Sequence, residues 1–216
     1  MTVQSFDTVK NHNKLLIRKA LEGSIFIKPY VEADAPITKI WTTAGGLIIP
    51  TGFVDVGLLN KKSAQKWARD TDSADTESFG YGEPTRRDIT KDISTADFSM
   101  QESKRQVLEL YNGADYSGVT ADADGNIVID KPSRPQVRLW TLLSLSKDGD
   151  AADAIYFARI MPMCQVTKIG DQTLGEDEEV LYPVTMTGYR EPAYKTAVRE
   201  IWGGPGIDRA AMGFGA

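Results

Sequence analysis

The stretch STADFSMQESKRQVLELYNG, residues 94–113, joins two different periodicities. In its first half, polar residues alternate with apolar ones, which is typical of a half-buried strand. The two sets are Thr95, Asp97 and Ser99 against Ala96, Phe98 and Met100. In its second half, Val107, Leu108 and Tyr111 recur at helical spacing, with polar residues on the other face. The stretch therefore predicts a strand that leads into one short helix.

The ends of this helix are indicated by local signals. Ser99 and Glu102 have the spacing of a capping box, in which the hydroxyl and the carboxylate each accept a hydrogen bond from a free backbone N–H. Gly113 stands where the C-terminus of a helix favours a residue with positive φ. We therefore expect the helix at about 100–111.

The rest of the chain reads mainly as strands. The candidates are 24–30, 47–57, 86–100, 135–146, 154–162 and 178–192, and Asp124-Gly125 indicates a tight turn. About eight strands and one helix predict a mainly β fold, an antiparallel β-sandwich or barrel with a flanking helix.

Three segments lack this pattern. Residues 60–86 are polar, and such a stretch forms a long hairpin or a mobile loop; we expect a long polar loop there. The first 23 residues have no clear period, and the last residues are rich in glycine. We expect an N-terminal arm at 1–23, one β domain at 24–200 and a C-terminal arm at 201–216.

Bulk composition limits the function. The 216 residues are 41% hydrophobic and 25% charged, enough for one packed domain, and the net charge of −5 argues against gripping a phosphate backbone. The single cysteine excludes an intrachain disulfide, which is consistent with a reducing cytoplasm. We find no secretory signal pattern and no apolar run near the roughly 18 residues of a membrane helix, so no membrane insertion is expected.

No constellation for catalysis or for a cofactor is visible. His12 and Cys164 are the only residues of their kinds and lie far apart in the sequence, which argues against a zinc site, and Cys164 reads as a small buried hydrophobe. The DADG at 122–125 lacks the later ligands of a calcium loop, and the chain has no G-x-S-x-G elbow or Walker A loop. We expect no enzyme, no cofactor and no metal, but a β-rich assembly subunit whose arms and loop need partners.

Four stretches carry a resemblance to a known family. They are residues 23–30, 52–89, 92–113 and 156–206, which include GSIFIKPY and the opening stretch. In order and combination they resemble the major tail protein, or tail tube protein, of long non-contractile-tailed phages (the siphophage type).

The resemblance implies a structural protein of the virion tail, made in the host bacterial cytoplasm. It implies a β-sandwich or barrel with one helix, six-subunit rings with joined sheets, and stacking of the rings into a tube. The implied partners are further copies, the tape measure protein, the tail terminator and the distal tail or baseplate proteins, while DNA passes through the bore without specific binding. The helix would cover an apolar face near the subunit boundary with Val107, Leu108 and Tyr111, or would plug one end of the sandwich.

A ring closes and a stack does not, so one chain must carry two different pairs of complementary patches. We expect the polar loop and the termini to make stacking contacts, and to lose entropy as they order on assembly. The candidate contact residues are Lys62, Trp67, Arg69, Asp70, Asp72, Phe79, Tyr81, Ile201 and Trp202. Acidic lumen candidates, which would keep DNA from adhering, are Asp88, Asp92 and Asp97.

Two alternatives stay open. One is a related inner-tube protein of a tailocin, a gene-transfer particle or a secretion apparatus, which genome neighbourhood would distinguish. The other is a monomeric adhesive β-sandwich domain, which would present an exposed aromatic platform and would not polymerise.

Overall fold

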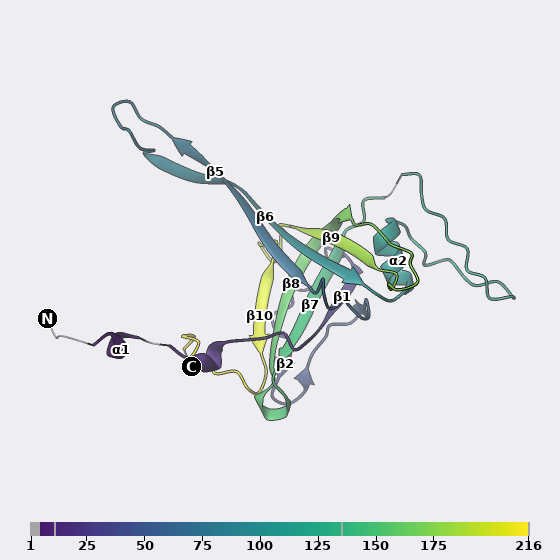
Figure 1. The fold of residues 1–216 in the computed structure, drawn as a ribbon, viewed down its shortest axis with the longest axis horizontal. Helices are drawn as coiled ribbons and strands as arrows, with labels where there is room; N and C mark the ends of the chain where they lie inside the picture. Colours follow the sequence, from purple (N-terminus) through teal and green to yellow (C-terminus); the bar gives the residue numbers. More distant parts are fainter. Residues whose placement is uncertain (1–4, 11, 135, 216) are drawn as a thin grey trace.

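A single antiparallel sheet organises the molecule in a computed structural model that describes residues 5–10, 12–134 and 136–215 (Figure 1). The order of its strands is β4-β1-β7-β8-β9-β6-β5, and β10 also pairs with β8. The strands are β1 Glu22–Pro29, β4 Val54–Asp55, β5 Lys66–Thr76, β6 Arg86–Met100, β7 Trp140–Asp148, β8 Ile155–Ile169, β9 Tyr182–Tyr189 and β10 Arg199–Gly203. The predicted mainly β fold is confirmed, but the described strands do not close into a barrel.

Small elements complete the described chain. A separate two-stranded sheet joins β2 Trp41–Thr42 to β3 Gly46–Leu47. The helical elements are α1 Phe6–Val9, η1 Lys14–Leu16, α2 Arg105–Asn112 and η2 Ala151–Asp153. The range 47–57 contributes only β4 and the end of β3 to the two sheets, because Pro50 and Gly52 interrupt it.

The central strands β1, β7 and β8 are buried on both faces. On β7, Leu142 belongs to the main core cluster while its neighbour Leu143 belongs to a second cluster on the opposite face. The main cluster lies between the sheet and α2 and includes Met161 and Met186. The second includes Ile160 and is covered by residues from the segment after β1 and by Ile201 of β10. Burial on both faces explains why β7 is nearly continuous in apolar residues.

The helix α2 covers the main core but begins later than predicted. Val107 and Leu110 are buried, and Leu108 and Tyr111 pack against the same cluster. Gly113 ends the helix in the left-handed conformation, at φ 62°, as expected.

The predicted helix start and the capping box are wrong. Ser99 lies in β6, opposite Pro183, and Lys104 is the N-cap residue, without a side-chain cap. The Glu102 carboxylate instead accepts a hydrogen bond from the Leu58 N–H at 2.6 Å. Residues 99 and 100 thus follow the sheet, since pairing with β9 outweighs a local cap.

The expected long polar loop at 60–86 is also corrected. Its central part, 11 residues, is strand β5, paired with β6 from Lys66–Asp97 to Thr76–Arg86, and residues 77–85 form the connecting tip. The result is a long hairpin that projects from the sheet (Figure 1). The polar composition reflects exposure on both faces of the hairpin rather than a lack of regular structure.

The two ends of the chain leave the sheet at one end of β8. The backbone N–H of Leu21 donates to Lys147 O at 3.0 Å, and residues 5–10 and 12–20 extend away from the sheet (Figure 1). Strand β1 begins at Glu22 and β10 continues to Gly203, so both predicted arm boundaries fall inside strands. In the connection between α2 and β7, residues 114–134 also project and form no strand, and they contain the tight turn closed by Gly125 N–H to Asp122 O.

Candidate assembly surface

The distal part of the hairpin β5–β6 extends beyond the other strands of the sheet. Strand β6 pairs with β9 only between Thr95 and Met100, so its first nine residues, Arg86–Ser94, pair with β5 alone. Ala96, Phe98 and Met100 are buried in the core, whereas the distal part is exposed. One strand therefore runs from the core to a free tip.

Two bidentate ion pairs link the strands of the hairpin. Arg69 donates to both carboxylate oxygens of Asp92, at 2.8 and 2.7 Å, and Arg87 donates to those of Asp75, at 2.6 and 2.8 Å. These hydrogen bonds hold the pKa of the Asp75 and Asp92 carboxyls below the usual value. Each pair is exposed, so its contribution is the geometry of the strands rather than a large stabilisation.

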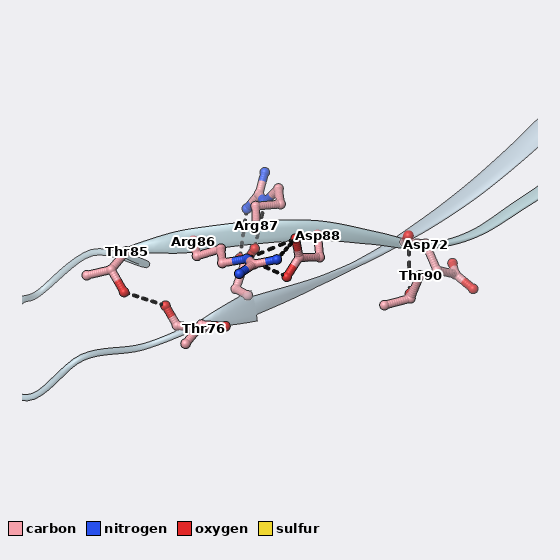
Figure 2. A network of polar contacts seen from close by, with 8 residues as sticks. Asp72, Thr76, Thr85, Arg86, Arg87, Asp88 and Thr90 are labelled. Carbon is pink, nitrogen blue, oxygen red and sulfur yellow. Dashed lines mark hydrogen bonds and ion pairs between the residues drawn. The ribbon is translucent and has the colours of Figure 1, made fainter.

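Further polar contacts continue to the tip (Figure 2). Lys91 Nζ lies 2.9 Å from Asp70 and 3.4 Å from Asp72. Arg86 pairs with Asp88 at 2.8 Å, as Figure 2 shows. Close to the tip, the Thr85 hydroxyl donates to the Thr76 carbonyl. Residues 66–76 thus form a regular strand within a single chain.

The tip presents two aromatic side chains. Phe79 is fully exposed and Tyr81 is 72% exposed. Gly80, at φ 87°, supplies the turn between them, and Ser78 O accepts from the Tyr81 N–H at 3.2 Å. Exposed aromatics on a defined turn are typical of a contact element.

At the root of the hairpin lies a groove of about 720 Å³. Its aromatic lining is Trp67 of β5, Phe157 of β8 and Trp202 of β10, and the rings of Phe157 and Trp202 are stacked with centroids 5.0 Å apart. Arg159 lies over Trp67 at 5.5 Å and pairs with Glu200 at 2.8 Å. We call this the root groove.

The predicted contact residues separate into three places. Arg69, Asp70 and Asp72 lie on the hairpin and Phe79 and Tyr81 at its tip. Trp67 and Trp202 line the root groove, while Ile201 packs against the second core cluster. Lys62 lies exposed in the connection before β5.

The three lumen candidates do not share one face of the sheet. Between Asp92 and Phe98 the pairing of β6 has no register shift, so alternate residues lie on alternate faces of the sheet. Asp92 therefore lies on the face of Ala96 and Phe98, whereas Asp97 lies on the opposite face. Asp88 and Asp92 are each paired with an arginine, so they add little net negative charge. The part of this face around Asp97, on β6 and β9, is polar and includes three threonines, Thr95, Thr185 and Thr187, whereas its part on β7 and β8 carries the second core cluster.

Sequence analysis missed Phe157, Arg159 and Glu200. Phe157 and Arg159 stand in a buried strand pattern and Glu200 in a polar turn-like segment, so nothing local marks them as a group. The register Glu200–Arg159 and Trp202–Phe157 between β10 and β8 brings them together.

Other site types find no support in the described ranges. Across residues 5–10, 12–134 and 136–215, no three His, Cys, Asp or Glu side chains gather in a way that suits a metal ion. In the same residues, no helix has the length and apolar character to cross a membrane. Cys164 is buried, and burial raises the pKa of its thiol.

The fold is that of a β-rich protein with a long hairpin that projects from its sheet. A family model described as "Phage tail tube protein" matches residues 10–199. The chain belongs to the phage tail tube protein family, and it is a structural component of the virion tail whose family assembles into a tube.

Comparison with other proteins adds little. No protein with a curated description matches the chain. A solved structure titled "Crystal structure of Hcp protein" is similar at 12% identity and a TM-score of 0.31, with 83% of this chain and 98% of that chain covered.

Proposed function

We propose that the chain polymerises as stacked hexameric rings into the tail tube of a long non-contractile-tailed phage, the conduit for DNA delivery. The proposed partners are other copies of the chain, the tape measure protein, the tail terminator and the distal tail or baseplate proteins. The observation that carries the proposal is the ordered hairpin beyond the sheet, in a chain that belongs to the tail tube family over residues 10–199.

Two kinds of contact are available for two kinds of interface. The sheet has β4 at one edge and β5 at the other, so the edges of neighbouring copies can pair head to tail and close a ring. The distal hairpin projects beyond this sheet, and together with the arms expected at 1–23 and 201–216 it is our candidate for contacts between rings. Such contacts repeat without closing, as a tube requires.

We assign the lumen to the polar face that carries Asp97. Its threonines and Asp97 make it hydrophilic, and Lys66 and Lys168, which occupy the positions paired with Asp97 and Thr185, add positive charge to the same face. Asp92 lies on the other face and Asp88 is neutralised by Arg86, so we no longer place these two in the bore.

Negative-stain electron microscopy of the purified chain, dilute and then concentrated, tests the proposal. Hollow tubes or stacked six-fold rings are the expected result. Exclusively monomeric protein, also with the tape measure protein added, would contradict it and favour the adhesive domain, for which glycan binding is the next measurement.

Shortening the hairpin tests its role separately. Because Asp72 and Lys91 are paired across the strands, a two-residue Asn-Gly turn can replace residues 73–90. We expect a folded monomer, by circular dichroism, that builds no tubes. Normal tubes from this variant would remove the hairpin from the assembly mechanism and leave the tube function itself intact.

A further inference from the structure

We propose that the hairpin tip of one copy, residues 77–85, docks into the root groove of a second copy of this chain. The inference rests on the proposed tube function and names the two surfaces that meet. It pairs two exposed aromatic side chains, Phe79 and Tyr81, with a groove lined by aromatics.

The contact joins two chains, because the tip cannot reach the groove of its own chain. Nine residue steps along β5 separate Trp67, at the groove, from Thr76, at the start of the tip. At about 3.3 Å per residue this corresponds to roughly 30 Å. The cross-strand pairs Arg69–Asp92 and Arg87–Asp75 hold the hairpin extended over this distance.

The groove has the size and the chemistry for the tip. Its volume of about 720 Å³ lies within the range of about 300–1,000 Å³ that is typical of binding pockets. Trp67, Phe157 and Trp202 present ring faces and edges on which Phe79 and Tyr81 can stack. Burial would remove these two exposed rings from water, as at the centre of a protein interface.

Charge complementarity supports the same pairing. The tip contains Glu77 and Glu83 and no lysine or arginine. Lys61 lines the root groove, and Arg190 lines the adjoining groove of about 740 Å³, which shares Trp67, Arg159 and Glu200 with it. Among the residues that the structure describes, neither Lys61 nor Arg190 has an ion-pair partner. Both side chains can therefore form ion pairs with an acidic segment of another copy.

Disulfide cross-linking of two variants, each with one introduced cysteine, tests the contact. Gly82→Cys places a thiol on the tip, where a Cβ meets no atom within 4 Å, and Ala64→Cys places one in the exposed groove lining. The native Cys164 is buried and takes no part. The matched control is Gly118→Cys, on the other projecting loop, where a Cβ also meets nothing within 4 Å.

We expect the full-length Gly82→Cys and Ala64→Cys chains to form a mixed disulfide at least about ten-fold faster than Gly118→Cys and Ala64→Cys, because docking raises the effective thiol concentration. Adding Phe79→Ala and Tyr81→Ala to the Gly82→Cys chain should abolish this advantage. Adding Ile127→Ala and Val128→Ala, which removes exposed apolar side chains elsewhere, should preserve it.

Equal rates for the tip and the control would overturn the inference. A Gly215→Cys chain that cross-links to Ala64→Cys faster than the tip does would overturn it too, and would assign the groove to the C-terminal segment. Electron microscopy of the same samples separates the two proposals. Tubes that form without the tip-to-groove cross-link would support the tube function and contradict the tip-to-groove contact. Cross-linked chains that form no tubes would support the contact and contradict the tube function.

Discussion

The two halves of β6 are held by different forces. From Thr95 to Met100 the strand pairs with β9 as well as with β5, and Ala96, Phe98 and Met100 are buried. From Arg86 to Ser94 it pairs with β5 alone, and its contacts are exposed ion pairs and threonine hydrogen bonds. Apolar burial sets the stability of the part from Thr95 to Met100, whereas cross-strand polar pairs set the direction and register of the part from Arg86 to Ser94. A regular strand therefore does not imply a stable one.

The largest effect should come from the core half. Phe98→Ala removes a side chain that is 2% exposed, and we expect a loss of about 3–5 kcal/mol of unfolding free energy. Ile89→Ala, on the same strand but 68% exposed, should change it by less than about 0.5 kcal/mol. Urea denaturation followed by tryptophan fluorescence measures both, and similar losses would contradict the contrast between the halves.

A smaller loss of unfolding free energy is expected at Trp67, where the hairpin leaves the sheet. Trp67 is half-buried against the main core cluster, opposite Ala96, where the hairpin leaves the sheet. We expect Trp67→Ala to cost about 1–3 kcal/mol, less than Phe98→Ala, because part of the ring already faces water. The same denaturation series gives the value, and a cost as low as that of Ile89→Ala would move the boundary towards the core.

The smallest change in global stability should come from acid. The paired Asp75 and Asp92 have a lowered pKa, so their stabilisation is present above the ordinary carboxyl pKa of about 3.9 and is lost as the pH falls through the lowered value. We expect hydrogen-exchange protection of the distal hairpin amides to fall below about pH 4, while β7 amides stay protected.

Removing the arginines provides the control for this pH effect. In an Arg69→Gln and Arg87→Gln chain, the hairpin amides should lose protection already at neutral pH and show little further dependence on acid. Hairpin protection that is the same at neutral and acidic pH in the unaltered chain would show that other contacts hold the strands together.

How far the sequence predicted the structure depended on whether the deciding contact was local. The strand 86–100 was predicted with its observed ends, and Gly113 as the helix end, because alternation and positive φ are local properties. The predicted start of the helix was wrong because Ser99 pairs with a strand more than 80 residues later in the chain, and no local cap pattern reveals that pairing.

The prediction of a long polar loop at 60–86 was wrong for a related reason. Its composition is typical of a loop, yet its charges are arranged so that Arg69 meets Asp92 and Asp75 meets Arg87 once the chain turns at 77–85. Opposite charges placed symmetrically about a glycine-rich turn were the available signal for a hairpin. The root groove had no such signal, since its walls come from β5, β8 and β10.

The continuity of β6 has a mechanical consequence. A pull on the tip along the hairpin runs parallel to the strand and perpendicular to its hydrogen bonds with β9. The load is then shared in shear by all the residue pairs from Thr95–Thr187 to Met100–Tyr182, instead of opening them one after another. Tension at the hairpin tip is thus transmitted along β6, past the register shift at Asp72/Ser73, to the strand end that precedes helix α2.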